Sequence, residues 1–281
     1  MISLYDFLFF LQKQSFYFRR QDQILTLLTQ LTMADPKKIL DEIQKIDPDL
    51  YQQTCSEVQR NAQFETRSSV NRVRYGEPDY PIEFTFLIDP PLVFSYIGTP
   101  VWKREKIAVV GSRQPSQKSI WWLRRELSSL LSLSEFVTVS GGAIGVDQWV
   151  HQASVDLKLP TIAILPSGLN QLYPHSFVPL VEPILATGGC VLSEFADDQT
   201  VKKHHFCHRN RLIAGLGKVS LIVEAREKSG TLITAHRALE MGKDVFVVPG
   251  HPLDDSFKGS LSLLKLGAHI MTAADDVHYW L

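Results

Sequence analysis

Several features that would assign this 281-residue chain to a particular class are missing from its sequence. Its three cysteines, Cys55, Cys190 and Cys207, are scattered and odd in number, which argues against a disulfide framework and favours the reducing cytoplasm. No uninterrupted apolar run reaches the length of a membrane span. The apolar N-terminal stretch lacks the basic region and small-residue cleavage site of a signal peptide, and it fits an amphipathic helix equally well. We therefore expect no membrane association.

Common nucleotide-binding and catalytic signatures are missing as well. The chain has no Walker A loop, no G-x-S-x-G turn and no run of carboxylates typical of a two-metal site. The nearest match to the dinucleotide motif G-x-G-x-x-G begins with Ser140 in place of glycine. The strand that follows it offers no acidic residue for a ribose. We predict that the protein binds no NAD and needs no other cofactor.

A zinc site is an alternative for the histidine-rich segment that contains His204, His205, Cys207 and His208. The spacing would place His204 and His208 on one helical face. However, no second group of ligands lies nearby in the sequence, and no glutamate is placed as in H-E-x-x-H. We predict that this segment holds no metal ion.

The overall composition is that of an ordinary globular protein, with 44% hydrophobic and 21% charged residues. The formal net charge is only −1, so the chain as a whole is not basic. Any contact with nucleic acid must therefore come from a local basic patch, and its affinity should fall steeply with salt.

Residues 1 to about 75 have the apolar periodicity of a small all-helical module. Asp35-Pro36 and Asp47-Pro48 each predict the start of a helix, with aspartate as the N-cap and proline in the first turn. The residues that we expect to face inward are Leu4, Phe7, Leu8, Leu11, Ile24, Leu27, Leu28, Leu31, Ile39, Leu40 and Ile43. Nothing in this module indicates chemistry, so packing or a partner contact is its expected role.

From residue 76 the sequence pattern changes. A proline-rich linker comes first, and alternating strands, glycine turns and helices are predicted after it. We place a domain boundary near residue 76, which gives domains 1–75 and 76–281. Six apolar segments predict strands, and they begin near Lys106, Phe136, Thr161, Cys190, Val219 and Asp244. Helices are expected at 116–131, 145–157, 177–186 and 229–241. This alternation of strands and helices predicts an α/β fold with a doubly wound, mostly parallel sheet of the Rossmann-like type.

Glycine and small hydroxyl residues follow four of the predicted strands or open the next helix. These turns are residues 111–113, 140–142, 166–168 and 229–231. In a parallel sheet they meet at one edge, where ligands bind. Backbone N–H groups at helix N-termini bind anions there. A glycine after a strand is often only a tight turn, but four on one edge predict a phosphate-binding surface.

A basic stretch faces that edge. Within ten residues the chain has Lys202, Lys203, Arg209 and Arg211, without one acidic residue, together with Phe206 and Asn210. A basic cluster with an interleaved aromatic is suited to holding phosphates while a base stacks. The alternative is a solvated helix face.

Together these motifs resemble the DNA-processing protein A family, DprA/Smf. The resemblance is carried by GSR (111–113), SGGAIGVD (140–147), PSGLNQLYP (166–174), LSEF (192–195), F-x-x-RNRLIAG (206–215), VEAREKSGTLITAHRALEMG (223–242) and VFVVPG (245–250). It covers roughly residues 76 to 270.

The resemblance implies an extended Rossmann domain that follows a small helical, SAM-like module. It implies sequence-independent binding and protection of single-stranded DNA, and loading of the RecA recombinase during natural transformation, usually by a homodimer. Some members add a C-terminal winged helix, and we expect none here. The last apolar segment, residues 257–271, is a candidate dimer surface, although core packing explains it equally well.

Carried over by motif position, the resemblance assigns the DNA-binding residues. They are Gly111, Ser112, Arg113, Ser140, Gly141, Gly142, Lys202, Lys203, Phe206, Arg209, Asn210 and Arg211. Arg113, Lys203, Arg209 and Arg211 are the expected phosphate ligands, Phe206 the stacking platform, and the backbone of 140–142 a phosphate cradle. Members of the family commonly carry an arginine in this glycine loop, where the chain has Ala143-Ile144. That departure gives more weight to Lys202 and Lys203.

Structural roles remain open for three of these side chains. Arg209 or Arg211 could instead form an ion pair, for example with Glu194 or Glu224. Phe206 could simply pack in the core.

Two rival functions also remain. One is a nucleotide phosphoribohydrolase-like enzyme of the same superfamily, and the other a sensor of a small nucleotide. The enzyme group carries a PGGxGTxxE signature, and the corresponding segment here, 229–234, has isoleucine and threonine where that group has glutamates. Without that carboxylate no general acid–base group is evident, so we predict a binder and no catalytic residue.

Overall fold

The computed structural model describes residues 2–14, 20–31, 35–61, 70–133, 136–278 and 280. The chain forms two compact units. The first comprises Met1–Tyr96, Ser167–Gln171 and Ser193–Thr200. The second comprises Ile97–Pro166, Leu172–Leu192 and Val201–Leu281.

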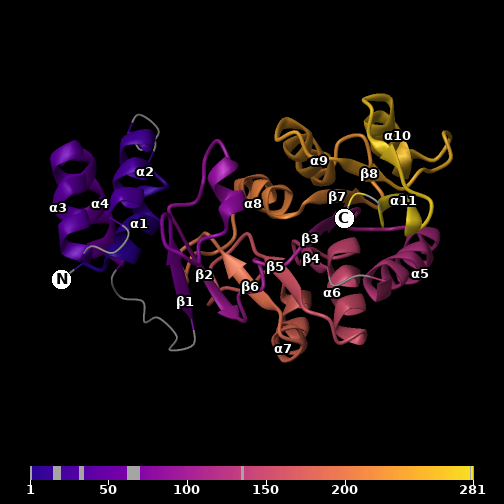
Figure 1. Ribbon diagram of the computed structural model, residues 1–281, viewed down its shortest axis with the longest axis horizontal. Coiled ribbons are helices and arrows are strands. Elements are labelled where there is room, and N and C mark those ends of the chain that lie inside the picture. The colour runs from indigo at the N-terminus through magenta and orange to yellow at the C-terminus, as the bar shows by residue number, and fades with distance from the viewer. Residues whose placement is uncertain are drawn as a thin grey trace. The chain divides into compact units, whose positions relative to one another are not determined.

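The first unit contains the helical module (indigo and violet in Figure 1). Its helices are α1 (Leu4–Leu11), α2 (Gln21–Gln30), α3 (Pro36–Ile46) and α4 (Pro48–Asn61). As predicted, the Asp35 side chain accepts a hydrogen bond from the Lys37 backbone, and Asp47 accepts one from the Leu50 backbone. The expected inward face is confirmed for α1 and α3, whose predicted apolar residues are all buried. On α2, Ile24 and Leu28 are buried, and Leu27 and Leu31 are partly buried against the same core.

Strand β1 (Asn71–Arg74) pairs antiparallel with β2 (Val93–Gly98), and a 3-10 turn, η2 (Ile82–Phe86), lies between them in sequence. Arg74 is buried and donates to the carbonyl oxygens of Leu28 and Leu31 in and after α2. Arg72 forms an ion pair with Asp6 of α1. These contacts tie β1 to the helices that precede it. The boundary near residue 76 stays a prediction, and β1 lies on its N-terminal side.

The second unit is built on a parallel sheet. Its strands are β3 (Lys106–Val110), β4 (Val137–Ser140), β5 (Thr161–Ile164), β6 (Cys190–Ser193), β7 (Val219–Ile222), β8 (Val245–Val247) and β9 (His269–Ile270). They are ordered β6-β5-β4-β3-β7-β8-β9, and neighbouring strands are parallel. All six predicted strands are present, and the short β9 adds a strand at the end.

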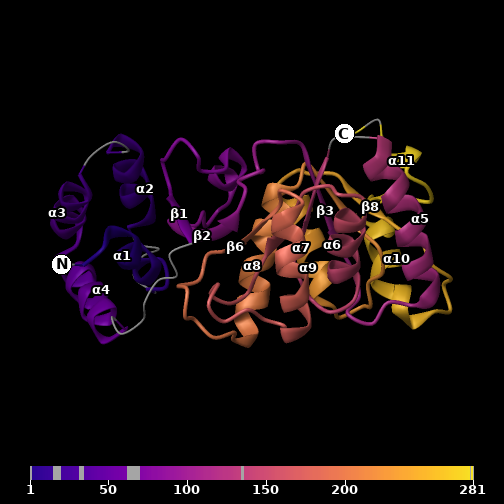
Figure 2. The same cartoon turned by 90° about the horizontal axis from the view of Figure 1, so that it is seen from below.

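Helices cover both faces of this sheet, which confirms the doubly wound α/β fold. They are α5 (Gln117–Leu133), α6 (Val146–Asp156), α7 (Val178–Ala186, after the turn η3, His175–Phe177), α8 (Lys203–Leu216), α9 (Gly230–Glu240), α10 (Lys258–Lys265, after the turn η4, Asp255–Phe257) and α11 (Asp275–His278). Figure 1 shows α8 and α9 on one side of the strands and α5, α6 and α7 on the other. Figure 2 shows α7, α6 and α5 in a row across that second face.

The strands of the second unit are apolar because both of their faces are covered. Every residue of β3, β4, β5 and β7 is buried. Ile107 and Val109 of β3 pack with Leu123 and Leu127 of α5 and with Val150 of α6. Across the described residues, no helix combines the length and apolar character needed to cross a bilayer.

The order in which the chain adds strands to the sheet reverses between β3 and β7. From β3 the chain winds outward through β4, β5 and β6, and from β7 it winds the other way through β8 and β9. The helices after β3 and β7 therefore leave the sheet on opposite faces. Their connecting loops separate at the carboxyl ends of these two strands, and such a switch point is where doubly wound sheets form their ligand crevice.

A buried polar network lies between β4, β5 and α6. Nδ1 of His151 contacts the Thr161 hydroxyl at 2.8 Å, and Thr161 in turn accepts from the Thr138 hydroxyl at 2.6 Å. The other ring nitrogen of His151 is buried without a partner. Burial, together with the positive charge of Arg209, lowers the pKa of His151 to about 3. The histidine is therefore neutral in the folded protein.

This neutral histidine predicts a loss of stability in mild acid. In the unfolded chain His151 takes up a proton below its ordinary pKa of 6.5, whereas in the folded chain it does so only near pH 3. As pH falls through this window, the free energy of unfolding should decrease by at most about 1.4 kcal/mol per pH unit. Urea unfolding between pH 7 and pH 5 measures the slope, and His151→Gln should make it shallower. An equal slope in both proteins would show that His151 is not responsible.

Candidate functional site

The switch point holds a cavity of about 830 Å³ within the second unit. Its walls come from the loop after β3, the turn before α6, the first half of α8, the loop after β7 and the start of α9. Of the predicted site residues, Gly111, Ser112, Arg113, Lys203, Phe206, Arg209 and Asn210 line it. Four segments far apart in the sequence thus meet at the edge that the strand-end turns indicated.

The loop after β3 brings Arg113 to the cavity. The guanidinium of Arg113 is exposed and lies 4.7 Å from the centre of the Phe206 ring. This loop lies tightly against Gly145, which has φ +92°. A Cβ at Gly145 would come within 2.4 Å of the Ser112 carbonyl oxygen, so a side chain there would push the Arg113 loop away.

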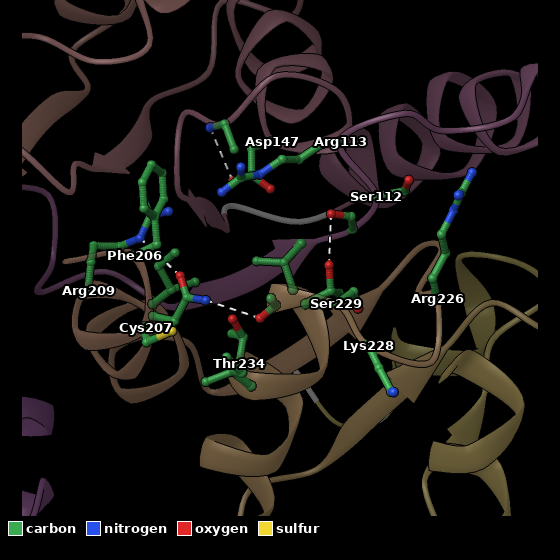
Figure 3. Close-up of a pocket in the computed structure, with 18 of the residues that line it drawn as sticks. Ser112, Arg113, Asp147, Phe206, Cys207, Arg209, Arg226, Lys228, Ser229 and Thr234 are labelled. Carbon is green, nitrogen blue, oxygen red and sulfur yellow. Dashed lines mark hydrogen bonds between the residues drawn. The ribbon is translucent and has the colours of Figure 1, made fainter. Parts of the chain in front are cut away.

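The start of α8 presents the basic and aromatic residues that the sequence singled out. Lys202 and Lys203 are exposed, and Lys203 lines the cavity. Phe206 is half-buried, and the edge of its ring meets the Tyr173 ring at a centroid distance of 6.0 Å. Figure 3 shows Phe206 beside Arg209 on this wall. Part of the Phe206 side chain remains accessible, so core packing does not account for all of it.

Arg209 has a structural role that the sequence left open. Its side chain is 3% exposed, and its guanidinium donates to the carbonyl oxygens of Gly141 and Ile164, which follow or end β4 and β5. A Cβ at Gly141 would lie 2.5 Å from this guanidinium. Glycine is needed here because the arginine packs directly on the loop backbone.

The contact between Arg209 and Gly141 lies over the loop formed by residues 140–142, which is buried. Ser140 is fully buried, and its hydroxyl donates to the Val109 carbonyl oxygen. Gly141 and Gly142 are buried too, and the cavity does not reach any of the three. Arg209 occupies the space over Gly141 that a phosphate would need. Contact between this loop and DNA stays a prediction.

Asn210 and Arg211 are also buried. Asn210 accepts a hydrogen bond from Nε of Arg209 and donates to the Gly230 carbonyl oxygen, so it joins α8 to the start of α9. Arg211 donates to the His208 carbonyl oxygen, and the cavity does not reach it. Glu224, an expected partner in the ion-pair alternative, instead accepts from the Ser116 backbone and the Ser119 hydroxyl at the start of α5. Of the basic side chains that the structure describes, none forms an ion pair with Glu224.

The N-terminus of α9 forms the floor opposite the Arg113 loop. The Thr231 hydroxyl donates to the Gly111 carbonyl oxygen at 2.9 Å, and Asn210 holds Gly230 from the other side. The Ser229 hydroxyl, at the N-cap, is buried without a partner. Uncapped backbone N–H groups and the positive end of α9 therefore face the cavity, which favours an anion.

Two cationic residues of the cavity were not among the predicted site residues. Arg226 and Lys228 are exposed in the loop between β7 and α9. Figure 3 places both across the cavity from Phe206 and Arg209. The signal that could have identified them is the strand-end rule itself, since they follow a predicted strand at the same edge as Gly111–Arg113.

The cavity carries a strongly positive balance. Its cations are Arg113, Lys203, Arg209, Arg226 and Lys228, and its carboxyl group is that of Asp147. Burial raises the pKa of Asp147, although Arg209 and the backbone N–H of Ala143 act in the opposite direction. A carboxyl group with a raised pKa adds less negative charge, so the site suits an anionic ligand.

The histidine-rich start of α8, the segment of the zinc alternative, forms contacts within the protein. His205 is buried, and its Nδ1 contacts the Lys202 backbone N–H and the Pro166 carbonyl oxygen. Within the described part of the chain, no three histidine, cysteine, aspartate or glutamate side chains are grouped so that they could hold a metal ion.

A family model and known bacterial proteins match this chain. The family model for DNA recombination-mediator protein A matches residues 71–281. The DNA processing protein DprA of Bacillus subtilis is 34% identical over 210 residues, which cover 74% of this chain and 70% of that protein. The DprA of Streptococcus pneumoniae is 37% identical over 199 residues, covering 70% of each chain.

Solved structures of DNA processing protein A also match the chain. The X-ray structure of DNA processing protein A from Streptococcus pneumoniae matches with a TM-score of 0.80 and 29% identity, over 98% of this chain and 97% of that one. DNA processing protein A of Helicobacter pylori, described for its single-stranded DNA binding mode, matches with a TM-score of 0.66 and 31% identity. That match covers 74% of this chain and 93% of the other.

Arg209→Ala should destabilise the second unit. The change leaves the carbonyl oxygens of Gly141 and Ile164 without their donor and opens space beside Gly141. Hydrogen bonds to charged groups contribute about 1.5–3 kcal/mol each, so we expect the free energy of unfolding to fall by on the order of 3 kcal/mol. Urea unfolding measures this loss. Lys203→Ala, an exposed cation on the same helix, is the control and should change stability by less than about 0.5 kcal/mol. Equal stability of the two variants would rule out the structural role of Arg209.

Proposed function

Because the chain belongs to the DNA recombination-mediator protein A family, as its resemblance to DprA/Smf predicted, we propose that it binds and protects single-stranded DNA at the switch-point cavity. The observation that carries this proposal is the cavity itself. It joins exposed cations on two walls, a helix N-terminus and an accessible aromatic ring within about 830 Å³. The Helicobacter pylori relative, whose single-stranded DNA binding mode has been described, supports the ligand class.

Phosphates are held by the exposed cations and by the start of α9. Arg113, Lys203, Arg226 and Lys228 are all exposed and line the cavity, so successive phosphates of one strand can be neutralised within it. Arg209 does not take part directly, because its guanidinium is held by backbone carbonyl oxygens. These contacts carry no sequence information, since they are made to the backbone of the strand.

One base stacks on Phe206. Every base has a π-face, so an aromatic platform is tolerant of sequence. Arg113 lies over one face of the Phe206 ring at 4.7 Å, so the proposed base stacks on the part of the ring that the guanidinium leaves accessible, with Arg113 beside it available to a phosphate. A phosphate and its attached base can thus be bound by one arginine–phenylalanine pair.

The family suggests the wider role. We propose that the bound strand is handed to the RecA recombinase during natural transformation in the cytoplasm, and that the protein acts as a homodimer without catalysing a reaction. A dimer offers two cavities to one strand, which raises the affinity for a long strand by linkage.

The enzyme and nucleotide-sensor alternatives make a different prediction. An enzyme would need a catalytic carboxyl group, and the cavity is lined by that of Asp147. Asp147 is buried and accepts a hydrogen bond from the Ala143 backbone, so it stabilises the turn before α6. A sensor or a hydrolase would bind a mononucleotide as tightly as a strand, whereas a strand binder needs several nucleotides for affinity.

Fluorescence anisotropy with labelled oligonucleotides tests the function. The wild-type protein should bind single strands tightly, bind duplexes and mononucleotides weakly, and lose affinity as salt rises. Arg113→Ala and Lys203→Ala should each weaken single-strand binding and lower the slope of log K against log salt by about 0.7 for each phosphate contact removed. Lys158→Ala, a cation that does not line the cavity, is the control. Indifference to single strands, or tight mononucleotide binding that yields free base, would refute the proposal.

Phe206→Ala should weaken single-strand binding by about 1–3 kcal/mol, because a stacked base is lost. Phe206→Leu is the matched variant, since it retains apolar volume beside Tyr173 but offers no π-face. Both variants should keep the wild-type far-UV circular dichroism and melting temperature. If leucine restores full binding, packing and not stacking explains the residue.

A further inference from the structure

Helix α5 exposes an aromatic side chain close to the cavity. Trp121 is 63% exposed, although indole rings usually bury most of their surface. It lies four residues after the start of α5 at Gln117, and Gln114 in the preceding turn lines the cavity. At 1.5 Å of rise per residue, Trp121 lies about 6 Å along the helix from its first residue. An exposed tryptophan therefore lies in the second turn of the helix that follows the cavity-lining loop in the chain.

Two guanidinium groups accompany it. Arg125 lies one turn further on, with its guanidinium 4.8 Å from the centre of the Trp121 ring. Arg124 precedes it by one residue and lies over the ring of Trp149 of α6 at 4.2 Å. Residues three and four positions after Trp121 share its side of the helix, so both arginines are its neighbours.

This arrangement repeats the chemistry of the cavity. In the cavity, the Arg113 guanidinium lies over the Phe206 ring at 4.7 Å, and on α5 the Arg125 guanidinium lies over Trp121 at nearly the same distance. Each pair offers an aromatic face for a base and a cation for the neighbouring phosphate.

The other tryptophans of this region have packing roles, and Trp121 does not share them. Trp122 and Trp149 are partly buried against the core under α5 and α6, and the indole of Trp122 donates to the Thr272 carbonyl oxygen. Arg124 is exposed and, among the described residues, forms no ion pair. Arg125 pairs with the buried Glu126 through Nε, while its side chain remains 59% exposed.

The cavity is too small for the whole ligand. Its volume of about 830 Å³ is that of a site for one drug-sized molecule, whereas folds that bind single strands without sequence preference cover about 4–16 nucleotides. The strand must therefore continue onto the surface beside the cavity. Helix α5 begins three residues after the cavity-lining Gln114, and its two exposed arginines complement a phosphate backbone.

We infer that Trp121, Arg124 and Arg125 form a second subsite for the same single strand, in which a base outside the cavity stacks on Trp121 and the arginines bind adjacent phosphates. This inference rests on the proposed function and extends its site along α5.

The test compares oligonucleotides of two lengths. A short thymidine oligomer of about four nucleotides occupies the cavity and the surface at its mouth, and one of about twenty is long enough to extend along α5. For Trp121→Ala, we expect unchanged affinity for the short oligomer and a loss of roughly five- to hundredfold for the long one. Trp121→Phe should restore most of that loss, because it keeps an aromatic face. Ile82→Ala, which removes a side chain of similar exposure (66%) from the first unit, is the control and should bind both like wild type.

A charge variant and a spectroscopic signal complete the experiment. Arg124→Gln should weaken only the long oligomer, and its salt dependence should become shallower. Indole fluorescence of the wild type should be quenched by the long oligomer, and Trp121→Phe should lack part of that quenching.

The outcomes separate the two proposals. Wild-type protein that fails to bind even the short oligomer refutes the proposed function and with it the subsite. Normal binding of both lengths by Trp121→Ala refutes the subsite and leaves the cavity intact. If Trp121→Ala binds DNA normally but no longer loads the recombinase, the α5 surface is a protein contact. That result also overturns the subsite.

Discussion

The cavity depends on the side chain of Arg209, which is buried where the loops after several strands meet. Its guanidinium donates to carbonyl oxygens at the ends of β4 and β5, while the adjacent Asn210 donates to the first residue of α9. Helix α8 thus joins both halves of the doubly wound sheet across the switch point. A buried charge is stable only when its donors are satisfied, so these carbonyl oxygens fix the position of α8 closely. The exposed face of the same helix carries Lys203 and Phe206, and it is therefore held at a defined place on the cavity wall.

Two kinds of cation follow from this arrangement. Arg209 and Arg211 are buried and donate to backbone carbonyl oxygens, whereas Arg113, Lys203, Arg226 and Lys228 are exposed at the cavity. Only the exposed group can exchange water and counterions for phosphates, which is the source of salt-dependent affinity for nucleic acid. The net charge of −1 is compatible with the proposed DNA binding because cations from three separate segments of the chain are collected at one cavity.

The prediction from sequence was accurate where a property is set by local pattern. The apolar runs of β3 to β8 and the helical periodicity around α1 and α3 predicted those elements, because buried strands and amphipathic helices have their own periods. Asp35 and Asp47 predicted two helix starts through their capping chemistry. Strand β1 was not predicted, since four residues with the sequence NRVR have no apolar run, and Arg74 is buried there only because its guanidinium reaches α2 carbonyl oxygens. The strand-end rule predicted a binding edge, and the resemblance to the family supplied Arg113, Lys203 and Phe206 as candidate site residues, which line one cavity in the structure.

By itself, the sequence determined the α/β class and the family, and it predicted the edge of the sheet at which a ligand binds. Those properties follow from periodicity, from turn residues and from motifs that are contiguous in the chain. Only the tertiary structure decided which basic residues are available to a ligand. Arg209 and Arg113 were both predicted phosphate ligands, yet one is enclosed by carbonyl oxygens and the other is exposed over Phe206. The tertiary structure likewise brought Arg226 and Lys228 to the opposite wall and left Trp121 exposed on α5. Burial depends on which distant segments pack together, and that information is not present in any local stretch of sequence.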